Sequence, residues 1–228
     1  MSPAVAAPVF DLQSHSRHSD GELSPSELVA RAAEAGVQLF AVTDHDTVDG
    51  VPEALEAGMH HPIEIVPALE LSSVDESGDD LHILGYRVDH ASADLLAILR
   101  VLRDDRAARI DAMAERLRAL GFALADAPLE ERRLAGRPLG RPHLATAILS
   151  HPDNAARLAA EGIDGPDAPF AAYPVPGAPA FVARTRPTSY DAIDLIHAAG
   201  GVAVWAHPFW DLDSDEQTLS TVDRFADA

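Results

Sequence analysis

The stretch FDLQSHSRHSDG, residues 10–21, contains several side chains that can bind metal ions, namely Gln13, His15, His18 and Asp20. If Phe10 to His15 is a strand, side chains two residues apart share a face, so Gln13 and His15 project together from its end. The chain has no cysteine, which excludes thiolate ligands and disulfides. A metal site here must therefore rest on imidazole, carboxylate or amide groups.

Comparable polar residues lie at the ends of later apolar stretches. His45 lies near the end of LFAVTDHD, Glu70 lies late in IEIVPALELSS, His82 lies at the start of LHILGYRVD, and His207 ends GVAVWAH. One histidine or acid at a strand end is more often structural, but the carboxyl ends of parallel strands meet at one rim. The set therefore predicts a shared site. Asp44 and Asp46 are expected either to hold the His45 ring or to be loop acids.

The elements between these residues favour an α/β fold. VFDLQ, residues 9–13, is typical of a short buried strand, and Ser24, Pro25 and Glu27 predict a capped helix that Gly36 ends. A strand at LFAVTDHD, a short helix over 51–57, and strands at IEIVPALELSS and LHILGYRVD follow. This alternation predicts a parallel sheet with helices outside.

The middle of the chain is different. Apolar residues recur at helical spacing from Ser92 to Leu120, and residues 137–162 are expected to hold two short helices. AYPVPGAPAFV, residues 172–182, is proline-rich and irregular, after which a helix over 190–199 and the strand GVAVW resume the alternation. Residues 93–180 therefore have the character of a helical insertion.

Composition narrows the possible partners. The formal charge is −20 and all 17 basic residues are arginine, which argues against long nucleic acid as a partner and excludes lysine-based Schiff-base or P-loop chemistry. Neither a signal peptide nor a membrane span is recognisable, so we expect a cytoplasmic protein that has no membrane contact. The oligomeric state is left open.

The segments DLQSHSRHSDG, TDHDTVDG, ALELS, LHILGY and AHP, in this order across residues 9–211, resemble the PHP (polymerase and histidinol phosphatase) family of metal-dependent phosphoesterases. The chain is most similar to the stand-alone members that hydrolyse nucleoside 3′,5′-bisphosphates or trim short RNA, which also carry a helical insertion. The resemblance implies a distorted (β/α)7 barrel. Its first part would be residues 9–92, its insertion subdomain residues 93–180, and its second, incomplete part residues 181–228.

The resemblance also implies residue roles. Metal-ligand and catalytic roles fall to His15, Asp20, His45, Glu70, His82 and His207, with Glu70 bridging two ions. Arg141 and His143, in GRPHLA, and Arg17 are implied to bind substrate phosphate. The donor set suits two or three divalent ions, of Mn, Fe or Zn.

Two features depart from the family pattern. Where the family pattern has His-x-His, this chain has Gln13 followed two residues later by His15. An amide oxygen is neutral and is a weaker ligand than imidazole. We therefore expect an altered metal site in which Gln13 binds the ion or orients a water. The family's late Asp-x-His motif is absent before residue 228. We therefore expect either a fragment of a longer protein or a natural truncation.

The expected activity is hydrolysis of a small phosphorylated metabolite or nucleotide, such as a nucleoside 3′,5′-bisphosphate, by water activated at the metal centre. Two alternatives stay open. One is a histidinol phosphatase or a polymerase-associated exonuclease. The other is a module that binds metal or nucleotide without turnover, because the closing Asp-x-His is absent.

Overall fold

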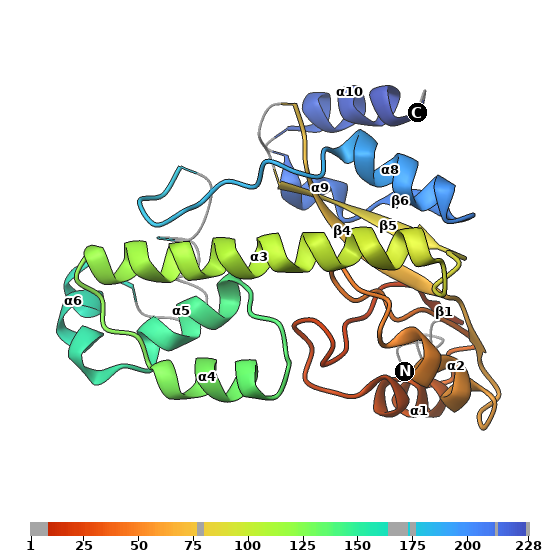
Figure 1. Cartoon of the computed structure of the whole chain (residues 1–228), viewed down its shortest axis with the longest axis horizontal. Helices are drawn as coiled ribbons and strands as arrows, with labels where there is room; N and C mark the ends of the chain where they lie inside the picture. The colour runs from red at the N-terminus through yellow and green to blue at the C-terminus, as the bar shows by residue number, and fades with distance from the viewer. Residues whose placement is uncertain (1–8, 77–79, 164–172, 174–176, 213, 227–228) are drawn as a thin grey trace, which may run out of the picture. The chain divides into compact units, whose positions relative to one another are not determined.

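The structure, a computed structural model, describes residues 9–76, 80–163, 173, 177–212 and 214–226. The chain divides into two compact units, the first formed by residues 1–101 and 185–228 and the second by residues 102–184. The division falls within the long helix α3 (Ala93–Ala119), drawn in yellow-green in Figure 1. All the strands among the described residues belong to the first unit.

The first sheet of this unit is parallel, in the order β1-β2-β3. Its strands are β1 (Phe10–Asp11), β2 (Leu39–Phe40) and β3 (Glu64–Ile65), connected by α1 (Pro25–Glu34) and α2 (Val51–Gly58). The two helices pack together, and Val29, Phe40 and Ala54 lie in the shared core. The predicted alternation of strand and helix is therefore confirmed in this part of the chain.

The predicted start of α1 is also confirmed. Ser24 Oγ accepts from the Glu27 backbone N–H at 3.2 Å, and the Glu27 carboxylate accepts from the Ser24 N–H at 2.8 Å. These reciprocal bonds satisfy backbone donors that the first helical turn leaves without intrahelical partners.

The prediction of a buried strand over VFDLQ is wrong in length and in burial. β1 comprises Phe10 and Asp11 alone, and Phe10 is 59% exposed. Among the described strands β1 pairs only with β2, so it is an edge strand, and both of its residues are exposed.

The second sheet is antiparallel, so the prediction of a parallel sheet throughout is wrong. Its strands are β4 (Ala68–Val74), β5 (Asp80–Tyr86) and β6 (Val202–Trp205), in the order β4-β5-β6. Residues 75–79 connect β4 to β5, and such a short connection permits a hairpin, whereas a parallel pair needs a crossover of a dozen residues or more.

IEIVPALELSS, predicted as one strand, is divided between the two sheets. Val66 N–H still donates to Phe40 O in the first sheet at 2.8 Å, but Pro67 has no N–H to continue the ladder. β4 begins at Ala68 and pairs with β5 instead. An isolated parallel bridge between His45 and Glu70 joins the chain after β2 to β4.

Helix α8 (Ser189–Ala198) packs against all three strands of the second sheet. Ile196 is fully buried there, and a Cβ at Gly85 would lie 2.8 Å from its Cγ1, so this approach requires glycine. After β6 come α9 (Pro208–Asp211) and α10 (Asp215–Ala226), drawn in blue in Figure 1. Phe225 of α10 makes edge-to-face contacts with Tyr190 and Trp205.

The second unit is helical in its described part. After α3 it contains α4 (Asp126–Leu134), α5 (Arg141–Leu149), the short 3₁₀ helix η1 (Pro152–Asn154) and α6 (Ala155–Ala160). Met113, Leu117, Leu144 and Ile148 lie in its core. The predicted helix from Ser92 to Leu120 and the helices within 137–162 are confirmed, whereas α4 was not predicted. Part of the proline-rich stretch 172–182 lies outside the described residues.

The mixed α/β class is thus confirmed. Within the described residues the strands form two three-stranded sheets, and no closed barrel is formed by them. Across the same residues, no helix combines the length and the apolar character needed to cross a membrane.

Candidate metal centre

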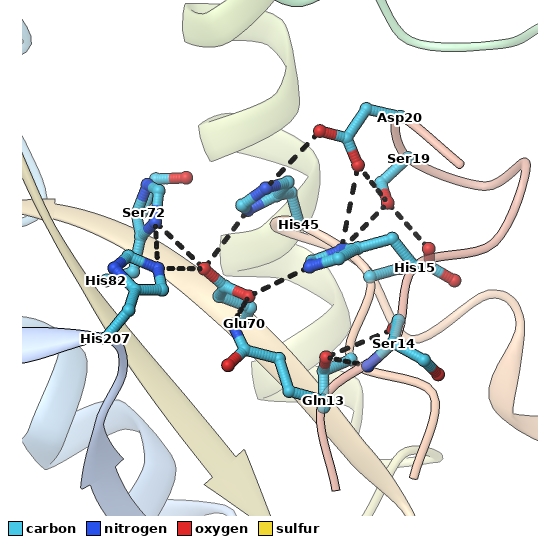
Figure 2. A network of polar contacts seen from close by, with 12 residues as sticks. Gln13, Ser14, His15, Ser19, Asp20, His45, Glu70, Ser72, His82 and His207 are labelled. Carbon is cyan, nitrogen blue, oxygen red and sulfur yellow. Dashed lines mark hydrogen bonds and ion pairs between the residues drawn. The ribbon is translucent and has the colours of Figure 1, made fainter. Parts of the chain in front are cut away.

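Glu70, on β4, is the centre of a group of imidazoles. Its side chain is 1% exposed; Oε1 lies 2.9 Å from His82 Nδ1 and 3.4 Å from His207 Nε2. Oε2 lies 3.2 Å from His15 Nε2 and accepts from Gln13 Nε2 at 2.9 Å. Figure 2 shows the carboxylate between these two sets, so each of its oxygens serves a different side of the site.

The antiparallel sheet brings His82 and His207 to Glu70. In the β4–β5 register Ser72 is opposite His82, which makes His82 the diagonal neighbour of Glu70 on the same face. Ala206 N–H donates to His82 O at 2.9 Å, which places His207 beside the start of β5. His207 has a φ of 29°, an uncommon conformation for a residue other than glycine and one that often marks functional sites.

His45 and Asp20 complete the group from the first sheet. His45 follows β2, with Nδ1 3.8 Å from Glu70 Oε1 and Nε2 3.7 Å from Asp20 Oδ2. Asp20 Oδ1 is 3.7 Å from His15 Nδ1, and the His15 and His45 rings stack with centroids 4.6 Å apart. Each of the two His45 separations exceeds hydrogen-bond length and matches two ligands of one ion, which lie about 3–4 Å apart when each bond is about 2.1 Å.

The structure therefore brings the predicted ligands together. They are Gln13, His15, Asp20, His45, Glu70, His82 and His207, all in the first unit. Gln13 and His15 do not project from a strand end as expected, because β1 stops at Asp11; they reach the same oxygen of Glu70 from the following loop.

Asp44 has a role that the sequence did not reveal. Instead of holding His45, this buried side chain accepts from Ser16 N–H at 2.7 Å, from Ser16 Oγ–H at 2.6 Å and from Ser19 Oγ–H at 2.6 Å. It thereby fixes the loop that carries His15 and Asp20. The only signal in the sequence is the presence of Ser16 and Ser19 between the predicted ligands His15 and Asp20. Asp46 accepts instead from the Ser72 N–H on β4, at 2.9 Å.

The electrostatics favour a charged carboxylate at the centre. Burial alone would raise the pKa of Glu70, but hydrogen bonds from His15, His207 and His82 outweigh it and hold that pKa far below its usual value. For His15, burial lowers the pKa, and the hydrogen bond and charge of Glu70 more than compensate, so the pKa is raised. The site thus keeps a carboxylate in contact with nitrogen ligands.

The donor set fits divalent metal ions. Two groups, His15-His45-Glu70 and Glu70-His82-His207, each offer ligand atoms within 4.8 Å of one another, and they share Glu70. Imidazole nitrogen with carboxylate oxygen, and no thiolate, suits Zn²⁺, Fe²⁺ or Mn²⁺. These atoms come from segments far apart in the sequence, so the arrangement exists only in the folded chain.

The residues expected to bind phosphate lie in two places. Arg17 is in the loop with His15, has a half-exposed side chain, and lies 3.9 Å from Glu53 Oε2. Arg141 and His143 begin α5 in the second unit, where His143 Nδ1 accepts from Gly140 N–H at 2.9 Å. Their roles in substrate binding stay predictions.

Comparison with known proteins identifies the family. Residues 11–112 match the PHP domain. Over 202 residues the chain is 35% identical to a 5′-3′ exoribonuclease of Haemophilus influenzae, an alignment that covers 87% of this chain and 68% of that protein. The chain belongs to the PHP-domain family. It is also 34% identical to a 3′,5′-nucleoside bisphosphate phosphatase of Chromobacterium violaceum, over 87% of this chain and 66% of that protein.

A solved structure supports the same assignment. A Chromobacterium violaceum protein described as an amidohydrolase with bound sulfate and no metal superposes with a TM-score of 0.81 at 30% identity, covering 96% of this chain and 74% of that one. This PHP-domain chain spans about two thirds of the length of the curated relatives. The predicted family is confirmed, and the names of both curated relatives describe the predicted class of activity, phosphoester hydrolysis on nucleotide substrates.

Proposed function

We propose that this PHP-domain chain is a metal-dependent phosphoesterase that hydrolyses a small phosphorylated nucleotide, such as a nucleoside 3′,5′-bisphosphate. The observation that carries the proposal is the position of Glu70: its Oε1 faces His82 and His207, and its Oε2 faces His15. A carboxylate shared in this way is suited to bridge two divalent ions. The name of the bisphosphate phosphatase relative supports the substrate class.

The proposed centre holds two or three ions of Mn, Fe or Zn. Its ligands would be His15, Asp20, His45, Glu70, His82 and His207, with Gln13 as an additional neutral ligand or as the group that orients a water. The charge of Glu70 offsets that of the ions inside a buried site, where an uncompensated charge would be costly. The acidic surface of the chain would not repel an anionic substrate from a centre of net positive charge.

Divalent ions held by these ligands would supply an activated water as nucleophile and stabilise charge on the phosphoryl oxygens. The protein would contribute the fixed positions of the ligands and cationic groups for the substrate. Arg17 offers a planar guanidinium that can pair with two phosphate oxygens, a geometry that lysine cannot copy. Arg141 and His143 are proposed to bind a phosphate of the substrate as well.

The proposal extends to the architecture. We propose that the two sheets belong to a distorted (β/α)7 barrel, with residues 93–180 as a helical insertion between its parts 9–92 and 181–228. The superposition with the Chromobacterium violaceum structure supports a shared fold over most of this chain.

The test is phosphate release from adenosine 3′,5′-bisphosphate with added Mn²⁺, measured for the native chain before and after chelator treatment. Chelator-sensitive release that returns with Mn²⁺ is the expected result. The matched variant is Glu70→Gln, which keeps the shape of the side chain and removes its charge. Release that survives both the chelator and this substitution would overturn the proposal.

A second candidate is exonucleolytic trimming of short RNA, because the Haemophilus influenzae relative is named an exoribonuclease. Short 5′-phosphorylated oligoribonucleotides in the same assay separate the two activities. Faster release of mononucleotides from the oligomer than of phosphate from the bisphosphate would favour the exonuclease. Histidinol phosphate in the same panel tests the histidinol phosphatase alternative. Metal binding without turnover of any of these substrates would favour a binding module.

A further inference from the structure

The ring of His15 is held with its two nitrogens in different surroundings. Nε2 points to Glu70 Oε2 at 3.2 Å (Figure 2). Nδ1 points away from Glu70, toward Ser19 Oγ at 3.5 Å and Asp20 Oδ1 at 3.7 Å. A neutral imidazole binds a metal through the nitrogen that lacks a proton, so the acceptor beside Nδ1 decides which nitrogen is available.

Ser19 is prepared to act as that acceptor. Its hydroxyl has one proton, and the 2.6 Å contact with Asp44 Oδ1 directs this proton to Asp44 rather than to Asp20 Oδ1, which lies 3.4 Å away. Oδ1 also accepts from the Ser16 backbone N–H at 2.7 Å, and a backbone N–H can only donate, which fixes Oδ1 as an acceptor. With its proton committed to Asp44, Ser19 Oγ presents lone pairs to the His15 ring.

Burial strengthens this order of hydrogen bonds. Asp44 and Ser19 are each 2% exposed and Ser16 is 0% exposed, so water does not compete for their groups. A Cβ at Gly50 would lie 2.9 Å from Asp44 Oδ2 and one at Gly21 would lie 2.0 Å from His15 O, which shows how closely the chain surrounds this loop.

We infer that Asp44 and Ser19 are positioning residues that keep the proton of His15 on Nδ1, so that Nε2 is the nitrogen offered to a metal ion. The inference rests on the proposed metal-dependent function. Asp44 orients Ser19, Ser19 accepts from Nδ1–H, and the ring is thereby fixed in rotation and in tautomer. Loss of such a supporting hydrogen bond typically weakens metal affinity by about 10- to 100-fold.

The test uses Zn²⁺, which is diamagnetic, on the full chain. Zn²⁺ affinity is measured by competition with a chromogenic chelator, and the state of the His15 nitrogens by nitrogen-15 NMR, with the His15 signals assigned through His15→Gln. In the native chain we expect zinc on Nε2 and a proton on Nδ1 that exchanges slowly with water. In Ser19→Ala we expect fast exchange of that proton and about 10- to 100-fold weaker zinc binding.

Ser73→Ala is the matched control, because Ser73 is also a buried serine and its hydroxyl donates to Leu81 O at 2.9 Å. Its neighbour Ser72 shares the strand face of Glu70, so Ser73 lies on the opposite face. In Ser73→Ala the zinc affinity and the slow exchange of the His15 Nδ1 proton should equal those of the native chain. Ser19→Thr keeps the hydroxyl and should restore both properties that Ser19→Ala loses. Native affinity in Ser19→Ala, or a proton on Nε2 in the zinc-loaded native chain, would overturn this inference alone. A native chain that does not bind zinc would overturn the proposed function with it.

Discussion

His82 Nδ1, on β5, lies 2.9 Å from Glu70 Oε1, on the neighbouring antiparallel strand β4. The contact exists because β5 starts where β4 approaches its end, so a histidine at the beginning of one strand meets an acid on the other. Two oxygens of one buried carboxylate then serve His82 and His207 on one side and His15 on the other. A single substitution at Glu70 is therefore expected to affect both sides of the centre.

Glu70→Gln should reduce phosphate release on the order of 100-fold or more, beyond the 10–100-fold typical of residues that only support a ligand. The amide keeps the volume of the side chain but removes the charge that the ions require. Glu64→Gln is the control, since Glu64 is an exposed acid on β3 in the same unit. Native turnover in Glu70→Gln would show that this carboxylate is not part of the active centre.

Divalent metal should stabilise the folded chain. The ligands converge only after folding, so the ion binds the native state far better than the unfolded one, and at 100 times its dissociation constant it adds about 2.7 kcal/mol to the free energy of unfolding. For a chain of this size that corresponds to a rise of about 5–10 °C in the thermal midpoint. Melting curves at increasing Mn²⁺ or Zn²⁺ measure the rise.

The comparison chain for this experiment is His82→Ala, in which one imidazole of the Glu70-His82-His207 group is missing. Its midpoint should rise less at the same metal concentration. Equal rises in the two chains would mean that the stabilising ion binds elsewhere.

Gln13→His should tighten metal retention. Gln13 Nε2 and His15 Nε2 both approach Glu70 Oε2, at 2.9 and 3.2 Å, so an imidazole at position 13 would reach the same ion as His15 and bind it more strongly than an amide. Metal content after extended dialysis is the measurement. Gln38→His, at an exposed position, shows what an added histidine does away from the centre. Equal retention in Gln13→His and the native chain would contradict the prediction.

The sequence allowed us to expect that the metal ligands lie close together, because this depends on where they stand relative to the predicted strands. Polar residues such as His45 and His207 directly follow apolar stretches, and strand ends collect at a rim. The direction of β5 could not be read from its composition, because parallel and antiparallel strands have similar apolar patterns when both are buried. The short connection 75–79 contains that information, because a parallel pair would need a crossover of a dozen residues or more.

The role of Asp44 illustrates a different limit. Its partners Ser16 and Ser19 lie more than twenty residues earlier in the chain, and only the folded loop brings their hydroxyl groups to its carboxylate. Residue type alone allows two roles for an acid beside a histidine, namely to hold the histidine ring or to be a loop acid. Likewise Phe10, apolar and within a predicted strand, is exposed on the edge strand β1, and no local pattern specifies that exposure.

An ion pair between Arg224 and Asp75 connects α10 to the end of β4, and we expect it to stabilise the fold. Arg224, on α10, donates from Nη2 to Asp75 Oδ2 at 2.9 Å and from Nη1 to Asp75 Oδ1 at 3.4 Å. Asp75 is buried, and its hydrogen bonds raise the pKa of Arg224 above the usual value. Arg224→Gln leaves this carboxylate with poorer partners, and we expect a loss of about 1–3 kcal/mol in the free energy of unfolding.

Urea unfolding measures that loss, with Arg31→Gln as the control. Arg31 is an exposed arginine of α1, and substitution of such surface residues changes stability by about 0.5 kcal/mol or less. Because Asp75 is withdrawn from solvent, the difference between the two variants should persist in high salt, which screens exposed charges far more than buried ones. A difference that disappears at 1 M salt would show that the pair acts only as a surface contact and does not anchor α10 to the end of β4.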